Sequence, residues 1–289
     1  NNHVLSAADV RKELVRFVDI AYQHSNVPII FNLFFGRYFA LLNYMRISRR
    51  ILLAFRTAFH MIWKVHNSAF LLQKAKEKLL YLRAVFSDYD KHCSKEDFSI
   101  HGYCLMSNHC HLNATSGTSS EPFSNHLRRA HSRYGQNYNR RHHRSGAFFN
   151  GRPQTKPIEN EHHRIRAFLY SDLNPVRAGI IRCPTDVRYR KFSSCRYYAL
   201  GEKTEFSKML IPPEWYLDLG KTPKQRQSEY RALLDHYMVE IGLKRDPTIS
   251  ESRFIGSGEW IEQMQARVRE LTRSGFRQTL DSPTDYDTS

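Results

Sequence analysis

The chain has 289 residues, of which 41% are hydrophobic and 13% aromatic, so it can bury a core and does not have the composition of a disordered protein. Its formal net charge of +16, from 44 Lys and Arg against 28 Asp and Glu, favours polyanionic partners, with nucleic acid ahead of an anionic membrane surface. Five cysteines without a C-x-x-C spacing argue against a disulfide framework and a four-thiolate zinc site, and they favour a reducing cytoplasm.

The first region, residues 1–55, is predicted to be a helical N-terminal extension. Val10, Leu14 and Phe17 recur at spacings of three and four residues, as on one face of a helix. The most apolar segment, residues 27–45, is interrupted by two asparagines and an arginine. It therefore falls short of the roughly 18 uncharged residues that a membrane-spanning helix needs. We expect no membrane partner and see no signal peptide.

The second region, residues 56–204, mixes strand-like and helix-like patterns. Residues 59–67 have the aromatic and β-branched content of a strand, and residues 69–86 repeat apolar side chains at helical spacing. Two further strands are predicted at 98–106 and 109–115, separated by a short turn. The order strand, helix, strand, strand predicts an α+β fold built on an antiparallel sheet.

The second strand of this hairpin begins with the sequence His109-Cys110-His111. Side chains two apart on a strand share a face, so the two imidazoles point together while Cys110 and Leu112 point to the other side. Two imidazoles on one face can bind one divalent metal ion. In a chain with 15 histidines, the pair alone is more often two histidines that bind no metal, so a second feature is needed to support a metal site.

A basic stretch follows at residues 121–166, with ten Arg and Lys against three Glu. Basic side chains can follow phosphates while interleaved aromatic rings stack on unpaired bases. Part of the stretch has helical periodicity, so the alternative is a solvated basic face with Phe123, Leu127 and Tyr134 turned inward. The residues predicted to contact DNA are Arg128, Arg129, Arg133, Arg140, Arg141, Arg144, Arg152, Tyr134 and Phe149.

Residues 164–181 have the pattern of an amphipathic helix with a proline near its middle. Tyr170 and Asn174 are four apart, so they lie one above the other on a face away from the apolar stripe. Pro175 cannot continue the helical hydrogen bonding, so the helix should kink or restart there. In the structural alternative Asn174 is an N-cap, Pro175 opens a new turn that ends at Gly179, and Tyr170 is a surface residue.

The third region, residues 205–289, is predicted to be a C-terminal helical module. Helical periodicity covers residues 222–243 and 256–273. The Ser, Thr and Asp residues that follow predict a loose tail.

Four segments, taken in order, resemble the REP-associated tyrosine transposases, a branch of the single-tyrosine HUH transposases. The resemblance covers roughly residues 57–200 and continues more weakly beyond them. The segments that carry it are YCLMSNHCHL, GAFFNGRPQ, FLYSDLNPVRAGII and RKFSSCRYY.

The resemblance implies a ferredoxin-like HUH domain with a central antiparallel sheet, packed helices and a divalent metal ion. It implies that His109, His111 and Asn174 hold that metal, Mg²⁺ or Mn²⁺ rather than Zn²⁺, and that Tyr170 attacks a DNA phosphate. The implied product is a covalent 5′-phosphotyrosine link with a free 3′-OH. The implied partner is single-stranded DNA with a hairpin. We expect a cytoplasmic, nucleoid-associated protein that acts as a monomer or homodimer.

The sequence departs from the family pattern at several places. Ser107 replaces the usual proline before Asn-His, Cys110 replaces an aliphatic residue between the histidines, and residues 1–55 are longer than usual. Pro153 and Pro157 flank a segment where the family has a strand, which predicts a short or edge strand. Two alternatives therefore stay open: an inactive or domesticated DNA-binding protein of the same fold, and a zinc-dependent RNA-binding protein.

Overall fold

The computed structural model describes residues 47–53, 56–240 and 244–280, and the side chains of these residues as far as 272. The helices predicted before residue 47 and the tail predicted after residue 280 lie outside the described residues. The chain divides into two compact units, Asn1–Ile47 and Ser48–Ser289, and every element below belongs to the second unit.

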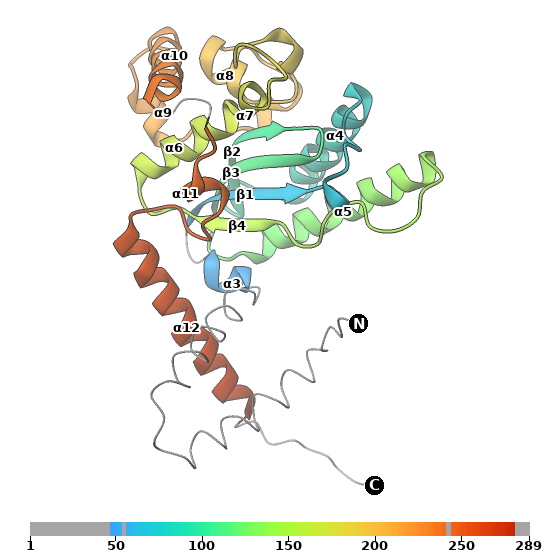
Figure 1. The fold of residues 1–289 in the computed structure, drawn as a ribbon, viewed down its shortest axis with the longest axis vertical. Coiled ribbons are helices and arrows are strands. Elements are labelled where there is room, and N and C mark those ends of the chain that lie inside the picture. Colours follow the sequence, from blue (N-terminus) through green and yellow to red (C-terminus); the bar gives the residue numbers. More distant parts are fainter. Residues whose placement is uncertain (1–46, 54–55, 241–243, 281–289) are drawn as a thin grey trace. The chain divides into compact units, whose positions relative to one another are not determined.

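A four-stranded antiparallel sheet lies at the centre of the described fold (Figure 1). Its strand order is β2-β3-β1-β4, so the first strand in sequence is inside the sheet and the last is at an edge. The mixed α+β architecture predicted from the sequence is confirmed. The strands are β1 (Ala58–Lys64), β2 (Phe98–Leu105), β3 (His109–Ser116) and β4 (Gln154–Pro157).

Helices connect the strands and form the C-terminal part of the chain. Among the described residues the helices before the C-terminal part are α3 (Arg49–Leu52), α4 (Ala75–His92), α5 (Glu121–Arg141), α6 (Glu161–Asp172) and α7 (Asn174–Arg177). They are followed by α8 (Cys195–Leu200), α9 (Glu214–Asp218), α10 (Pro223–Glu240), α11 (Pro247–Ser250) and α12 (Gly258–Leu280). Single 3-10 turns lie at His66–Ser68, Val187–Tyr189 and Ser207–Met209.

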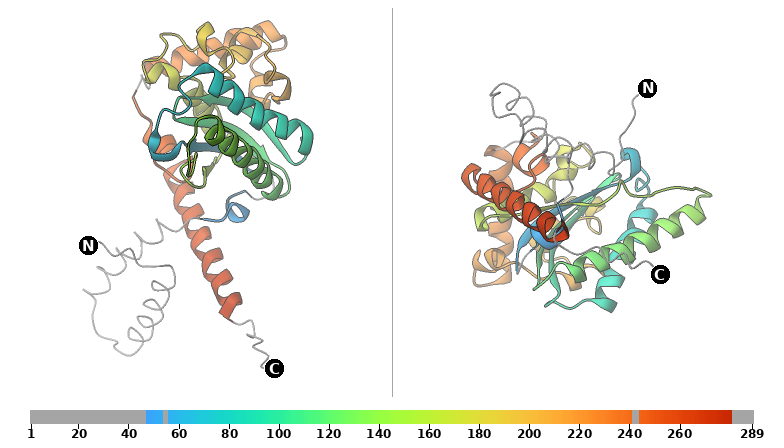
Figure 2. Two further views of the ribbon diagram at one scale, coloured as in Figure 1. Left: turned by 90° about the vertical axis from the view of Figure 1, so that its right-hand side faces the viewer. Right: turned by 90° about the horizontal axis from the view of Figure 1, so that it is seen from below.

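One face of the sheet is apolar and packs against α4 and α5, which lie side by side (Figure 2). Alternation along β1 places Phe59 and Trp63 on this face, where Phe59 meets Phe123 of α5 and Trp63 meets Tyr81 of α4. The ring centroids of these pairs are 4.8 and 6.1 Å apart. Burial of such rings supplies most of the driving force for this layer.

The opposite face of the sheet carries polar side chains and packs against α6. The contact between β2 and α6 is close at Gly102, where an added Cβ would lie 2.5 Å from the ring of Phe168. A register shift between Ile100 and Gly102 turns this glycine toward the helix. The small residue thus lets α6 approach the sheet, and α6 carries the predicted nucleophile.

The segment with two prolines forms a short edge strand, as the sequence predicted. β4 covers four residues and pairs with β1 alone among the named strands. Its Lys156 is buried and donates to the backbone oxygen of Ile249 at 2.7 Å, and a bridge between Ile158 and Ile255 follows. The C-terminal part of the chain therefore returns to this edge of the sheet.

The C-terminal helices pack on the outer side of α6. Tyr230 of α10 is fully buried, and its hydroxyl donates to Asp172, at the end of α6, at 2.6 Å. Among the described residues, no helix is both long enough and apolar enough to cross a membrane.

A buried carboxylate joins α4 to α5. Asp88 has no exposed side-chain surface and accepts hydrogen bonds from His126 at 2.9 Å and from Arg129 at 3.0 Å, and Arg133 lies 3.4 Å away. Burial alone would raise the pKa of Asp88, but the hydrogen bonds from Arg129 and His126 hold it below its ordinary value of 3.8. The carboxylate therefore stabilises the fold in its charged form.

Replacing Asp88 with Asn is expected to lower the free energy of unfolding by about 2–3 kcal/mol, because two guanidinium groups lose their shared charge. The pKa of this carboxyl is lower in the folded than in the unfolded chain. Its stabilisation is therefore complete above about pH 4 and disappears as the pH falls through the folded-state value. Urea unfolding of wild type and Asp88→Asn at several pH values measures both effects. Glu205→Gln, at an exposed ion pair with Arg83, is the control and should change stability much less.

Candidate active site

The two histidines of the H-x-H pair lie at the start of β3, on the polar face of the sheet that packs against α6. In the ladder between β1 and β3, His109 is opposite Lys64 and His111 is opposite Ile62. His111 is 3% exposed, whereas His109 is half-buried and lies nearer the end of the sheet. The ring centroids of the two histidines are 5.0 Å apart. The strand therefore presents both imidazoles on one face, as the spacing predicted.

The predicted helix break occurs at the proline. α6 ends at Asp172, and α7 begins at Asn174 with Pro175 as its second residue. The structural alternative expected Asn174 to be the N-cap, but that position is occupied by Leu173. Gly179 follows the turn with a φ of 67°. Restarting the helix leaves the Asn174 side chain free to point away from the helix end and toward β3.

Asn174 lies against both histidines. Its Nδ2 atom is 3.3 Å from Nε2 of His109 and within hydrogen-bonding distance of Nε2 of His111. Residues more than 60 positions apart in the sequence thus converge on one point, with the Nε2 atoms of both imidazoles directed at it. Two imidazole nitrogens and one amide oxygen form a donor set that suits a divalent cation. An amide rotated by 180° about its terminal bond would present its oxygen there.

The Nδ1 atoms of both histidines have other partners. Nδ1 of His109 lies 2.7 Å from Oδ1 of Asn108, and Nδ1 of His111 lies 3.0 Å from Nε2 of His60. Burial lowers the pKa of His109 to about 4 and that of His111 well below its ordinary value. Burial likewise lowers the pKa of His60 to about 3. Neutral imidazoles with Nδ1 engaged and Nε2 directed to one point are the form in which histidine binds metals.

Tyr170 lies in the last turn of α6, next to this point. Its ring centroid is 6.0 Å from that of His111, and the residue is 6% exposed. The guanidinium carbon of Arg177 lies 3.6 Å from the Tyr170 ring centroid, and the same side chain donates to the Tyr170 backbone oxygen. The predicted nucleophile is therefore beside the histidines but is covered by an arginine that the sequence prediction did not include.

The predicted DNA-contacting arginines divide into two groups. Arg129 and Arg133 lie at Asp88, and Arg141 pairs with Glu77 at 2.6 Å, so these three also hold α4 and α5 together. The remaining residues have neutral partners or are exposed. Arg128 and Arg140 donate to asparagine side chains, Arg144 donates to Asn139 and to the Ala147 carbonyl, and Arg152 is exposed.

The two aromatic residues predicted to contact DNA differ. Tyr134 is 2% exposed and its hydroxyl donates to Glu77 at 3.0 Å, so in this structure it offers no ring face to a base. The inward orientation that the sequence left as an alternative describes Tyr134 correctly. Phe149 is half-buried and stacks on His131, with ring centroids 4.1 Å apart.

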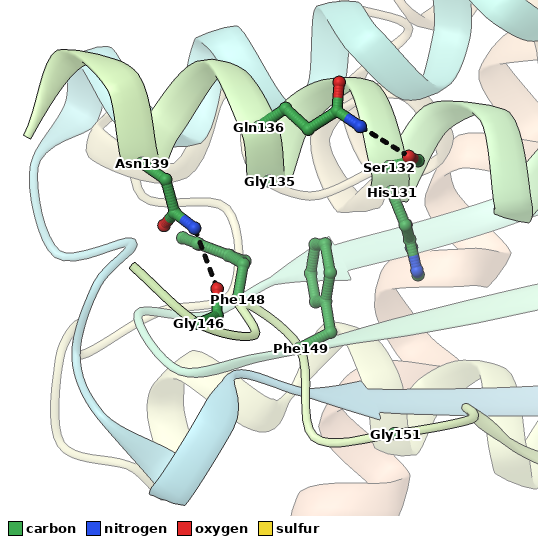
Figure 3. Close-up of a pocket in the computed structure, with 9 residues that line it drawn as sticks. All are labelled: His131, Ser132, Gly135, Gln136, Asn139, Gly146, Phe148, Phe149 and Gly151. Carbon is green, nitrogen blue, oxygen red and sulfur yellow. Dashed lines mark hydrogen bonds between the residues drawn. The ribbon is translucent and has the colours of Figure 1, made fainter. Parts of the chain in front are cut away.

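A shallow groove runs between α5 and the loop that contains Phe149 (Figure 3). Asn139 donates to the backbone oxygen of Gly146 at 2.8 Å and holds the loop to the helix at one end, while the rings of Phe149 and His131 form part of the floor. A second groove, lined by Arg128, Arg129 and Arg133, shares Ser132 and Gln136 with the first. The two grooves thus adjoin along α5.

The loop also connects the grooves to the histidines. The backbone N–H of Asn150 donates to the oxygen of Lys64 at 2.8 Å, and Lys64 is the β1 residue opposite His109. Lys64 is exposed and shares the sheet face of His109, because directly opposed residues in an antiparallel pair point the same way. The end of the sheet that holds His109 is therefore continuous with the loop beside α5.

A separate group of potential ligands lies between α4 and α5. Ligand atoms of Asp88, Cys93 and His126 are within 4.8 Å of one another. Asp88 already accepts hydrogen bonds from Arg129 and His126. The positive charges of Arg129 and Arg133 beside it would repel a metal ion. We assign this cluster to the stability of the helix pair.

The sequence analysis did not identify four residues that contact the site. They are His60, Asn113, Ser171 and Arg177. A single histidine inside the otherwise apolar strand FHMIW was a usable signal for His60, because a buried polar side chain needs a partner. Contacts of the other three depend on how α6 and α7 pack on the sheet.

The chain has a limited likeness to known proteins. No protein-family model matches the sequence, and no curated protein matches it. The chain is similar to a solved structure titled "Structure of the REP associates tyrosine transposase bound to a REP hairpin". The TM-score is 0.43 at 17% sequence identity, over 55% of this chain and 89% of that chain.

Proposed function

We propose that this protein is a metal-dependent DNA strand transferase of the single-tyrosine HUH type, acting on single-stranded DNA with hairpins. The observation that carries the proposal is the convergence of His109, His111 and Asn174 beside Tyr170. The strand order β2-β3-β1-β4, with α4 and α5 on one face of the sheet, is compatible with the ferredoxin-like architecture that the resemblance implies and so supports the proposal. The four sequence segments that resemble this transposase family support it independently of the packing.

In the proposed reaction the Tyr170 hydroxyl oxygen attacks a DNA phosphorus atom. The bond from that phosphorus to the 3′ oxygen breaks, and the phenol proton balances the 3′-OH of the upstream fragment that leaves. The downstream fragment stays bound through its 5′ phosphate as a phosphotyrosine. A divalent cation, Mg²⁺ or Mn²⁺, held by the two histidines and the Asn174 oxygen would polarise the phosphate. The phosphotyrosine conserves the bond free energy for rejoining to a 3′-OH.

Arg177 has two roles in this proposal. Its guanidinium group stacks on Tyr170 and holds the end of α6 through the Tyr170 carbonyl. The guanidinium group therefore lies beside the proposed nucleophile. Because guanidinium groups bind phosphate oxygens in a bidentate manner, Arg177 is placed to exchange its contact with the ring for a contact with the substrate.

The 6% exposure of Tyr170 favours the second candidate function, a DNA-binding protein of the same fold that does not cut DNA. The two candidates differ in whether a covalent protein–DNA adduct forms. Incubation of the protein with a broad set of single-stranded hairpins and Mn²⁺, followed by a denaturing gel, detects a covalent protein–DNA adduct. An adduct supports the transferase. Binding of hairpins with no adduct on any of them supports the second candidate.

The exposed face of α5 is expected to supply sequence-independent affinity for DNA. Replacing Arg128 and Arg140 with Gln should weaken binding to single-stranded DNA about tenfold. It should also reduce the slope of log affinity against log salt concentration by about 1.4, since each phosphate contact contributes about 0.7. Fluorescence anisotropy at several salt concentrations measures both quantities.

The control for this prediction removes the same charge elsewhere. Arg83 and Arg188 are exposed but pair with Glu205 and Asp186. If replacement of this pair with Gln reduces the affinity and the salt slope as much as the α5 variant does, binding depends on net charge and not on α5.

A further inference from the structure

Two buried polar residues on the site face of the sheet have no part in the proposed chemistry. His60 is not exposed at all, and Asn113 is 5% exposed. They lie directly opposite each other in the ladder between β1 and β3, behind the histidine pair. A buried polar group destabilises a fold unless it is hydrogen-bonded. Both side chains therefore need hydrogen-bond partners inside the fold.

The chain of hydrogen bonds begins at a backbone carbonyl of α6. The hydroxyl of Ser171 donates to the oxygen of Ala167 at 2.8 Å, and a carbonyl oxygen can only accept. The single hydroxyl proton of Ser171 is thereby used. Ser171 Oγ lies 3.0 Å from the amide nitrogen of Asn113, so it accepts from that amide. This contact turns the amide nitrogen of Asn113 toward α6 and its oxygen toward β1.

The orientation of Asn113 determines the proton position on the next ring. Its Oδ1 lies 2.9 Å from Nδ1 of His60 and can only accept, so Nδ1 of His60 carries a proton. His60 is fully buried, and the residue opposite it on β4 is the cation Lys156. A second positive charge at this position would be unfavourable, so His60 is neutral and its Nε2 has a free lone pair.

The same argument then applies to the predicted metal ligand. Nε2 of His60 lies 3.0 Å from Nδ1 of His111 and must accept, so Nδ1 of His111 carries the proton. In a neutral imidazole this leaves the lone pair on Nε2, the atom that faces Asn174.

We propose that His60 and Asn113 are positioning residues that fix His111 in the tautomer required for metal binding. Their hydrogen-bond chain anchors the ligand to the Ala167 carbonyl of α6, the helix that carries the nucleophile. The inference rests on the proposed function for the identity of the ligand as a metal, whereas the tautomer of His111 is a property of the metal-free protein. Because these hydrogen bonds run from α6 to His111, a shift of α6 that breaks the Ser171–Asn113 contact would also release the tautomer of His111.

The first experiment determines the tautomers directly. In the full chain without metal, ¹⁵N NMR of histidine-labelled protein should show Nδ1 of His111 protonated and Nε2 unprotonated. Asn113→Leu removes the acceptor, so His60 can place its proton on Nε2 and donate to His111. The Nε2–H form of His111 should then appear. Thr115→Val, two residues along β3 from Asn113, removes a hydrogen bond to His101 of the neighbouring strand β2. It is the matched control and should leave His111 unchanged.

The second experiment measures Mn²⁺ binding by calorimetry. His60→Leu should weaken binding about 10–100-fold, as loss of an outer hydrogen-bond partner does at other metal sites. His60→Gln keeps an acceptor near the position of Nε2 and should bind within a few-fold of wild type. The difference between two variants of similar size separates positioning of His111 from general loss of packing.

The possible failures are distinguishable. An Nε2–H form of His111 in the wild-type protein, or equal Mn²⁺ affinity of His60→Leu and His60→Gln, overturns the inference even if wild type forms the DNA adduct. An Nδ1–H form of His111 that shifts in Asn113→Leu, in a protein that forms no adduct, supports the positioning chain and counts against the strand-transfer function.

Discussion

Replacing Tyr170 with Phe is expected to reduce formation of the covalent DNA adduct by at least about 1,000-fold, because the change removes the phenolic oxygen that is the proposed nucleophile. The ring should stay in place. Phenylalanine retains the contact with Arg177 and the edge-to-face contact with His111, so folding and hairpin binding should change little. A denaturing gel with labelled hairpin DNA and Mn²⁺ measures the adduct, and anisotropy measures binding.

The matched control for this prediction is Tyr197→Phe. Tyr197 is half-buried in α8, and its ring packs on Tyr198 at 5.0 Å. It lies outside the proposed site, so its variant should form the adduct at the wild-type rate. Persistence of the adduct in Tyr170→Phe would show that another residue is the nucleophile.

The second large effect is expected at the metal site. His109→Ala should raise the Mn²⁺ dissociation constant by more than about 100-fold, since the change removes one of three proposed ligands. His109 is half-buried at the end of the sheet and lies outside the hydrogen-bond chain of His111, so this change leaves the core intact. Adduct formation should be lost along with the metal, whereas hairpin binding should stay within about threefold.

His162→Ala is the control for the metal site. His162 is exposed in the first turn of α6 and contacts only the His163 ring among the ring pairs of the described residues. Its variant should bind Mn²⁺ as wild type does. If His109→Ala also binds Mn²⁺ with wild-type affinity, the proposed ligand set is wrong.

Much of the local structure was predictable from the sequence because it depends on short-range periodicity and on backbone chemistry. Aromatic and β-branched content identified a strand at residues 59–67, and a turn signal identified a second at 109–115. The position of Pro175 identified the break between α6 and α7. The prolines at 153 and 157 indicated a short edge strand, which β4 is. The helix predicted at 69–86 exists, but it begins later, at Ala75, and continues to His92.

The roles of individual side chains in the basic stretch were less predictable. Helical periodicity showed that one side of residues 121–141 must be buried, yet Tyr134 was still assigned to DNA contact. Its position in the core depends on Glu77 of α4, 57 residues away in the sequence. Likewise, Arg129 and Arg133 both pair with Asp88, which becomes their neighbour only when α4 packs against α5.

By itself the sequence determined the residue types and local spacings of the candidate site: the paired histidines on one strand, and the tyrosine one helical turn before an Asn-Pro break. Only the tertiary structure decided that Asn174 meets both Nε2 atoms, that Arg177 covers Tyr170, and that His60 connects His111 to α6. The physical reason is that a strand or helix pattern specifies which face a side chain occupies. The partner on that face depends on strand register and helix packing, which join segments far apart in the chain.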